Sequence, residues 1–134
     1  WRPKKSVDTF NVEQLIELGK ELTLAHWQKS QPSALVTVNS FIARGVIAGL
    51  EKLNISPEQW PAIVSFDDDA KPQPRFFTAM QLDWREVGNI AANLLWARAF
   101  ASSSDLPMHC KISMNLQQRL TSQLRWGHDS SRVA

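Results

Sequence analysis

Apolar and polar positions along the chain follow two different periods, one typical of helices and one typical of strands. Apolar residues recur every three or four positions from Leu15 to Ala25, which predicts a helix over about 12–29. Asn11 followed by Gln14 resembles a capping box, a polar arrangement that starts many helices. Both signals place a first helix directly after Asn11.

Two short apolar runs after this helix predict strands. Each of the runs 34–38 and 62–66 contains a single hydroxyl residue among apolar ones, as expected of strands covered on both faces. Between them, apolar residues at helical spacing predict a second helix over about 41–53. Three adjacent acids and two prolines make 67–75 a loop, and a further strand is predicted at about 76–80.

A third helix and an edge strand are predicted in the second half of the chain. Asp83 with Glu86 forms another capping signature, after which apolar positions give the clearest amphipathic helix of the sequence, ending near residue 101. Strict alternation of apolar and polar residues at 108–116 predicts a half-exposed strand at a sheet edge. The last stretch, 125–134, has no pattern and is expected to be a frayed tail.

Helices and strands therefore alternate along the chain. This order predicts an α/β fold with a largely parallel sheet flanked by helices. In such folds ligands bind beyond the carboxyl ends of the strands. The segments at these ends are 39–40, 67–69 and 82–84, which makes them the first candidates for a functional site.

Length, composition and charge limit the classes of protein to which the chain can belong. The chain has 134 residues, 43% of them hydrophobic, enough for one sizeable core. Its formal net charge is +2 and its basic residues are scattered, which disfavours direct nucleic-acid binding by this segment. The lone Cys110 excludes an internal disulfide and fits a reducing cytoplasm. No apolar run or signal peptide indicates a membrane span or export, and the start without Met indicates a piece of a longer protein.

The acids at 67–69 are the sharpest polar cluster of the sequence. Adjacent carboxylates at a strand end can hold Mg²⁺ for phosphoryl transfer, whereas the simpler interpretation is a solvated loop with one carboxylate used for a polar ligand. A phosphoryl-transfer enzyme also needs a phosphate-binding loop, and no glycine-rich motif of that kind is present. The simpler interpretation is favoured, and no metal or cofactor is predicted.

Two aromatic residues lie beside the starts of predicted helices. Phe10 comes just before the first helix, and Trp84 stands at the head of the third. An aromatic face near a carboxylate and an amide suits a sugar, because the C–H face of the ring stacks while its hydroxyl groups need directional partners. The alternative is ordinary packing of either side chain.

Four segments, read in order, carry a further pattern. The stretch 34–50 combines ALVTVNS with ARGV and GL, 57–68 reads PEQWPAIVSFDD, 78–95 contains TAMQLDWREVG followed by AANLL, and 116–121 reads LQQRLT. Each is similar to a motif of the LacI/GalR family of transcription repressors, and the match covers about residues 8–122 in the family's order and spacing. The chain therefore resembles the C-terminal part of the effector-binding domain of that family.

This resemblance implies a type I periplasmic-binding-protein-like fold, in which two Rossmann-like lobes are hinged around a small ligand. Carried over by position, Asn39 and Asp67 would hydrogen-bond hydroxyl groups of a sugar-like effector. Phe10 would take the stacking position before the first helix, and Trp84 would line the cleft from the other lobe. A site built on such polar groups rejects analogues that lack a hydroxyl group.

The resemblance also implies a domain organisation. Residues 1–124 would be the C-terminal portion of the effector-binding and dimerisation domain, with about 76–101 belonging to the other lobe and 125–134 forming the tail. The helix 41–53 and the loop 69–75 would lie at a homodimer interface. Operator DNA would be bound through an N-terminal helix-turn-helix domain that this chain does not contain. The whole protein would be cytoplasmic and not an enzyme.

The chain departs from the family pattern at three positions. Ser40 replaces the usual Asp, Ser65 replaces Gly, and Leu82 stands where Gln is common, which points to an unusual ligand or a degraded site. Two other classes of protein stay open beside an effector-sensing regulator. One is a periplasmic solute-binding protein with the same fold, and the other is a Mg²⁺-dependent phosphoryl-transfer enzyme.

Overall fold

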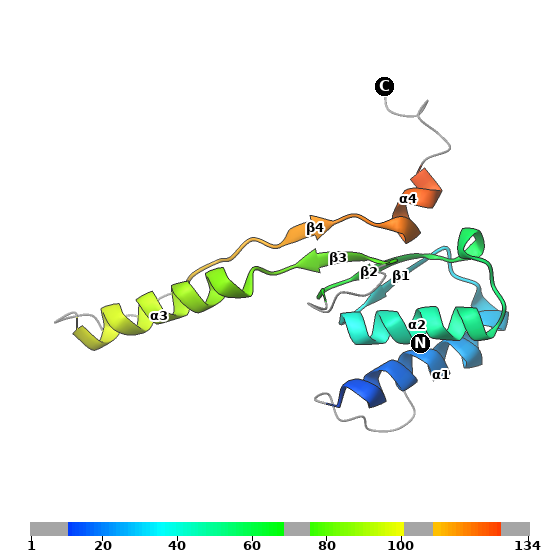
Figure 1. The fold of residues 1–134 in the computed structure, drawn as a ribbon, viewed down its shortest axis with the longest axis horizontal. Coiled ribbons are helices and arrows are strands. Elements are labelled where there is room, and N and C mark those ends of the chain that lie inside the picture. The colour runs from blue at the N-terminus through cyan, green and yellow to red at the C-terminus, as the bar shows by residue number, and fades with distance from the viewer. Residues whose placement is uncertain (1–10, 69–75, 101–108, 127–134) are drawn as a thin grey trace.

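A computed structural model of the protein describes residues 11–68, 76–100 and 109–126 (Figure 1). The elements are α1 Val12–Ser30, β1 Ala34–Thr37, α2 Ser40–Lys52, the short 3-10 helix η1 Pro57–Gln59, β2 Ala62–Ser65, β3 Thr78–Gln81, α3 Trp84–Phe100, β4 Asn115–Gln117 and α4 Leu120–Trp126. The helices α1, α2 and α3 and the strands β1, β2 and β3 begin and end within two residues of their predicted bounds. None of the helices in the described ranges is long and apolar enough to cross a membrane.

The strands form one four-stranded sheet in the order β1-β2-β3-β4. β1 and β2 pair in parallel from Ala34 with Ala62 to Thr37 with Ser65. β2 also pairs in parallel with β3, whereas β4 is antiparallel to β3. The predicted α/β fold with a largely parallel sheet is therefore confirmed, and the carboxyl ends of β1, β2 and β3 meet at one edge of the sheet.

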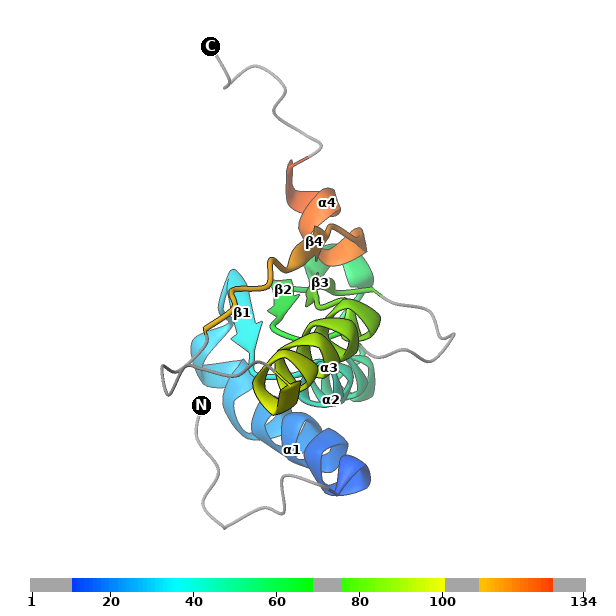
Figure 2. The same cartoon turned by 90° about the vertical axis from the view of Figure 1, so that its left-hand side faces the viewer.

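Two helices cover one face of this sheet. α2 lies against the strands, and α1 packs on the outer side of α2 (Figure 1, Figure 2). The buried apolar core consists of Trp27, Ala43, Val46, Ile47, Leu50, Trp60, Ile63, Phe77 and Ala79. Its burial fixes α2 against the strands, and with it the position of the α2 N-terminus at the carboxyl edge of the sheet.

The contact between α1 and α2 depends on glycine residues. A Cβ atom at Gly45 would overlap the carbonyl oxygen of Ile16, and one at Gly19 would overlap the carbonyl oxygen of Ile42. These oxygens belong to helix backbone, which cannot move aside without moving the whole helix. The two helices approach this closely because neither glycine has a side chain.

The outer face of β1 is uncovered among the described residues. Val36 of β1 is 69% exposed and Val38, directly after this strand, is 77% exposed, because α1 and α2 cover the opposite face. The apolar run 34–38 predicts a strand covered on both faces, and for this strand the prediction is wrong. An apolar run fits burial on both faces but does not identify the element that would cover each of them.

β3 and β4 lead to and from α3, which extends away from the other helices (Figure 1). No residue of α3 is buried, and Leu95, Trp96 and Phe100 are 72%, 67% and 68% exposed. The amphipathic pattern correctly predicts this helix. Its apolar side chains, however, contact little of the protein that the structure describes.

The predicted edge strand is much shorter than its pattern. Alternation at 108–116 predicts one continuous strand, whereas the structure forms β4 only at Asn115–Gln117, and 109–114 have no strand structure. β3, the partner of β4, is itself only four residues long. Alternation shows that a segment suits a strand, but a strand forms only where a neighbour supplies hydrogen bonds.

α4 has no counterpart in the sequence-based prediction. It includes residues 125 and 126, which were expected to begin the frayed tail, so for these two residues that prediction is wrong. Residues 127–134 lie outside the described ranges. A helix of seven residues is too short to be stable alone, and α4 forms because it contacts β2 and β3.

Gly45→Ala is expected to destabilise the protein by about 1–3 kcal/mol, because the added methyl group forces α1 and α2 apart. Gly88→Ala is the matched control. A Cβ atom at Gly88 meets nothing within 4 Å, and alanine in a helix is favoured over glycine by about 0.5–1 kcal/mol. Urea denaturation midpoints measure both effects. An unchanged midpoint in Gly45→Ala would show that the close contact does not exist.

Candidate functional site

Asn39 and Asp67 lie at the carboxyl edge of the sheet, after neighbouring strands. Each comes two residues beyond the pair formed by Thr37 and Ser65, which ends the parallel register of β1 and β2. The amide of Phe66 donates a hydrogen bond of 3.1 Å to the carbonyl oxygen of Thr37, so the strands stay together up to this edge. The fold thus brings two of the four predicted ligand contacts to one edge of the sheet.

The local structure around Asn39 fixes its side-chain oxygen. Asn39 is the N-cap of α2, with extended backbone at φ −157° and ψ 169°, and its Oδ1 accepts a hydrogen bond of 2.9 Å from the amide of Ile42. Such a cap satisfies one of the amide groups that the first turn of a helix leaves without a partner. Because Oδ1 is used in this way, the Nδ2 group carries the donors that a ligand hydroxyl would meet.

The loop after β2 holds Asp67 through its own backbone. The amide of Asp67 donates a hydrogen bond of 3.3 Å to the buried hydroxyl of Ser65, and Asp67 Oδ1 accepts one of 2.8 Å from the amide of Asp68. A carboxylate has about four acceptor positions, so this geometry leaves room for further hydrogen bonds. A donor at Asn39 and an acceptor at Asp67 suit a ligand with neighbouring hydroxyl groups.

The second acid of this loop forms an ion pair that is largely shielded from water. Arg119, between β4 and α4, donates from Nη1 to Asp68 Oδ1 at 3.0 Å and from Nη2 to Asp68 Oδ2 at 2.6 Å. The Asp68 side chain is 2% exposed and that of Arg119 is 17% exposed. Two parallel charge-assisted hydrogen bonds are the strongest arrangement that arginine and a carboxylate make. Both oxygens of Asp68 are therefore engaged within the protein.

Arg119 also contacts the start of β3. Its Nη1 donates a hydrogen bond of 3.3 Å to the carbonyl oxygen of Phe77, and its amide donates one of 3.0 Å to the hydroxyl of Thr78. From α4, the Thr121 hydroxyl is 3.2 Å from both the amide nitrogen and the carbonyl oxygen of Ile63. Neither Arg119 nor Thr121 stood out from the sequence as functional. Both lie in the closing family motif, which was the only signal for them.

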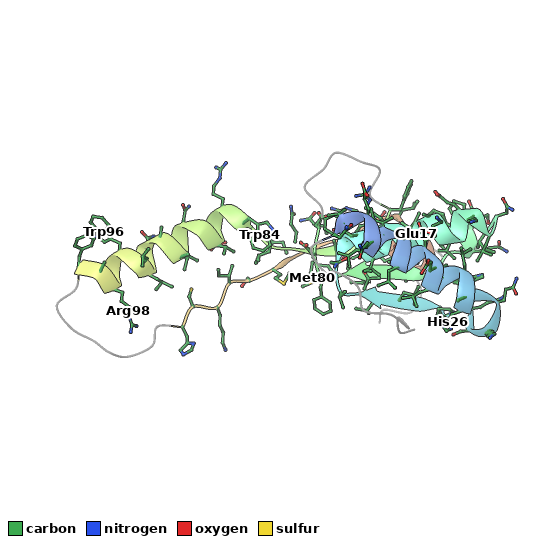
Figure 3. All side chains as sticks on the ribbon, turned by 90° about the horizontal axis from the view of Figure 1, so that it is seen from below. Glu17, His26, Met80, Trp84, Trp96 and Arg98 are labelled. Carbon is green, nitrogen blue, oxygen red and sulfur yellow. The ribbon has the colours of Figure 1, made fainter. Side chains whose placement is uncertain are left out.

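Trp84 lies on a different part of the fold. It is the first residue of α3 and is 65% exposed, and Figure 3 shows it at the end of α3 nearest the sheet, beyond Met80 of β3. Because β3 runs parallel to β2, Trp84 follows a strand that ends at the same edge as Asp67. Asp83 Oδ1 accepts a hydrogen bond of 3.2 Å from the amide of Glu86, which confirms the predicted cap.

Two predicted features lie outside the described residues. These are Phe10 and the segment 69–75, which includes the third acid of the loop. α1 begins two residues after Phe10, on the side of the molecule where β1 and β2 end (Figure 1). The stacking position of Phe10 stays a prediction.

Solved structures of transcription regulators share this fold. A transcription regulator from Staphylococcus saprophyticus is 18% identical, with a TM-score of 0.64 over 82% of this chain and 39% of its own. A LacI family regulator from an Arthrobacter species, in complex with lactose, is 20% identical, with a TM-score of 0.68 over 79% of this chain and 41% of its own. A LacI family regulator from Enterococcus faecium, with bound ribose, is 23% identical, with a TM-score of 0.63 over 79% and 39%. The chain spans about two fifths of the length of these proteins.

The two sequence comparisons differ in their outcome. No curated protein gives a significant match to the sequence. The family model of the periplasmic binding protein-like domain, in contrast, matches residues 3–122 of the 134. This range includes the whole parallel sheet and the edge at which Asn39 and Asp67 lie. The chain therefore belongs to the periplasmic-binding-protein-like domain family.

Proposed function

We propose that this chain is the C-terminal part of the effector-sensing and dimerisation domain of a LacI/GalR-type transcription regulator, and that it catalyses no reaction. The observation that carries the proposal is the placement of Asn39 and Asp67 at one edge of a parallel sheet, in a member of a ligand-binding domain family. Proteins of the same fold include LacI family regulators with bound lactose and ribose. We therefore assign a small sugar or sugar derivative as the effector.

The two polar residues suit a polyhydroxylated ligand. Asn39 has N–H donors and Asp67 has carboxylate acceptors, so neighbouring hydroxyl groups of a sugar can accept from one and donate to the other. Both residues are half-buried, and a ligand lacking one hydroxyl would leave a shielded polar group without a partner. Trp84, and Phe10 ahead of α1, would supply aromatic faces on which the C–H face of the sugar ring stacks.

The position of α3 suggests how the sensor would work. Of the segment of about 76–101 that the resemblance assigns to a second lobe, β3 pairs with β2 and packs in the core described above. The part that would belong to the second lobe is therefore α3, which accounts for its exposed apolar side chains. A ligand held between two lobes favours a closed arrangement only if it binds the closed state more tightly than the open one. In the whole protein, such a change would alter the spacing of paired DNA-binding domains.

The proposal includes partners outside this chain. A homodimer would form through the helix 41–53 and the loop 69–75, and operator DNA would be bound by a domain outside this sequence, in the cytoplasm. The scattered charges, +2 overall, are consistent with a sensor that does not itself contact DNA. Sugar-dependent binding of the complete protein to DNA tests this assignment. A monomeric, exported protein that binds a sugar but no DNA would instead be a solute-binding protein.

The magnesium-dependent enzyme has less support. It requires Asp67 and Asp68 to share a cation, whereas both oxygens of Asp68 accept hydrogen bonds from Arg119. A shared cation would have to displace this arginine from a largely buried position. Calorimetric titration with MgCl₂ decides between the two. Micromolar affinity for Mg²⁺ that disappears in Asp67→Asn would contradict the sensor proposal.

Asp67→Asn is expected to weaken sugar binding by the complete protein about tenfold to hundredfold, with an unchanged thermal midpoint. Asparagine keeps an oxygen for the amide of Asp68, but it replaces the other carboxylate oxygen by a donor. The loss of a hydrogen bond to a charged group corresponds to about 1.5–3 kcal/mol. Isothermal titration calorimetry with pentoses, hexoses and disaccharides, including ribose and lactose, measures the affinity.

Glu21→Gln is the matched control for this experiment, because it removes the same charge from an exposed position in the middle of α1. Its affinity for the same sugar is expected to be unchanged. Equal losses in both variants would indicate a general electrostatic effect, and unchanged affinity in Asp67→Asn would exclude Asp67 as a contact. If the unsubstituted protein binds no sugar of the panel, the assigned effector class is wrong.

Asn39→Ser separates the cap of α2 from the proposed ligand contact at the same residue. Serine caps a helix about as well as asparagine, so the free energy of unfolding is expected to change by less than about 0.5 kcal/mol. Serine lacks the amide donors, so sugar affinity is expected to fall about tenfold, or about 1.4 kcal/mol. Asn39→Ala loses the cap as well and should be destabilised by about 0.5–2 kcal/mol. Urea denaturation measures the change in stability, and calorimetry measures the change in sugar affinity. Unchanged sugar affinity in Asn39→Ser would show that Asn39 only caps α2 and does not contact the sugar.

A further inference from the structure

A largely buried ion pair joins the candidate ligand loop to a distant part of the chain. Asp68 follows β2, whereas Arg119 lies 51 residues later, between β4 and α4. Such pairs often add little net stability, because the cost of removing two charges from water offsets much of their attraction. Stability alone therefore explains this ion pair poorly. The parts of the chain that the ion pair joins are more informative.

On one side, the pair is a single residue away from the proposed sugar contact. The amide of Asp68 donates to Asp67 Oδ1 at 2.8 Å, so the orientation of the Asp67 carboxylate depends on the backbone position of Asp68. That backbone is held in turn by the Asp68 side chain, both oxygens of which accept hydrogen bonds from Arg119. A displacement of Arg119 would therefore move Asp68 and, through the hydrogen bond from the Asp68 amide, the Asp67 carboxylate.

On the other side, Arg119 lies at the ends of β3 and β4 that are farther from α3. It donates to the carbonyl oxygen of Phe77 and to the hydroxyl of Thr78, at the start of β3. β4 ends at Gln117, two residues before Arg119. β3 and β4 are the strands that lead out to α3 and back (Figure 1). A change in the direction of α3 would move both strands, and with them the start of β3 that Arg119 contacts and the end of β4 that it follows.

We propose that Arg119 is a positioning residue that couples the Asp67 carboxylate to β3 and β4 through its paired hydrogen bonds with Asp68. The proposal rests on the proposed function, because it takes the Asp67 carboxylate as a sugar contact. It adds the route by which movement of α3 relative to the sheet changes that contact. Arg119 itself does not touch the sugar.

Thr121 makes it possible to separate positioning from a purely structural role. Its hydroxyl hydrogen-bonds to the backbone of Ile63, so it fastens α4 to β2 without contacting Asp68. Thr121→Val keeps the shape of the side chain and removes those hydrogen bonds. Arg119→Lys keeps the positive charge, but a lysine ammonium group cannot make the two parallel hydrogen bonds of a guanidinium group.

The test compares Arg119→Lys with Thr121→Val in the complete protein, with the tightest-binding sugar of the panel as probe. Arg119→Lys is expected to weaken sugar binding about tenfold, or about 1.4 kcal/mol, and to accelerate hydrogen exchange at the amide of Asp68. Thr121→Val is expected to accelerate exchange at the amide of Ile63 and to lower the thermal midpoint, with sugar affinity unchanged. Equal losses of affinity in the two variants would overturn the proposal.

A double variant tests whether Arg119 acts through Asp67. When Arg119→Lys is combined with Asp67→Asn, the loss of affinity is expected to be no larger than in Asp67→Asn alone, because the contact to be positioned is already gone. Additive losses would show that Arg119 affects sugar binding by another route, and the proposal would be wrong.

The remaining outcomes separate this proposal from the proposed function. If the unsubstituted protein binds no sugar of the panel, the proposed function fails, and exchange at the amide of Asp68 still decides whether Arg119 fixes the loop. Unchanged exchange in Arg119→Lys would overturn the positioning role. If Arg119→Lys does not fold, Asp68→Asn takes its place in every measurement, because it keeps one acceptor oxygen for Arg119.

Discussion

The parallel register between β1 and β2 determines where the polar groups of the candidate site lie. Because Thr37 pairs with Ser65, the chain leaves both strands at the same edge of the sheet. A shift by one residue would send one of the two following side chains to the opposite face, since successive residues of a strand point to opposite sides. α1 and α2 stabilise this register. The chain passes from α1 into β1, and the close contact between α1 and α2 holds α2 against the strands.

The same hydrogen bonds that stabilise this edge also orient the candidate site. The cap that Asn39 makes on α2 uses its side-chain oxygen, so its amide nitrogen would be the donor in the proposed ligand contact, and the turn at Asp67 is closed by amide groups of the loop itself. A site whose side chains are already held by such contacts loses little conformational freedom when a ligand binds. This preorganisation fits a sensor, in which the ligand's binding energy has to shift an equilibrium between two arrangements.

Local signals predicted the elements, and long-range contacts account for what they missed. The caps at Asn11 and Asp83 and the apolar spacing after them located α1 and α3, and the rule on carboxyl ends of parallel strands singled out the segments that hold Asn39 and Asp67. The pairing of Asp68 with Arg119 joins residues 51 positions apart, and nothing near either residue in the sequence indicates it. α4 was missed for the same reason, since its contacts with β2 and β3 come from distant parts of the chain.

Several exposed apolar side chains are expected to be covered by other parts of the complete protein. Val36 of β1, Val38 directly after this strand, and Trp96 and Phe100 on α3 are all more than half exposed. Complete burial of a fully exposed apolar side chain contributes about 1.5–3 kcal/mol, and these side chains, already partly buried, would gain somewhat less. A surface that covered several of them would still contribute a large fraction of the stability of a domain. In the proposed two-lobed arrangement, the surfaces that cover α3 belong to the second lobe. Lobe closure would then move β3 and β4, whose ends farther from α3 are joined by Arg119 to the loop of Asp67 and Asp68, and this would link the stability of the lobes to the geometry of the candidate site.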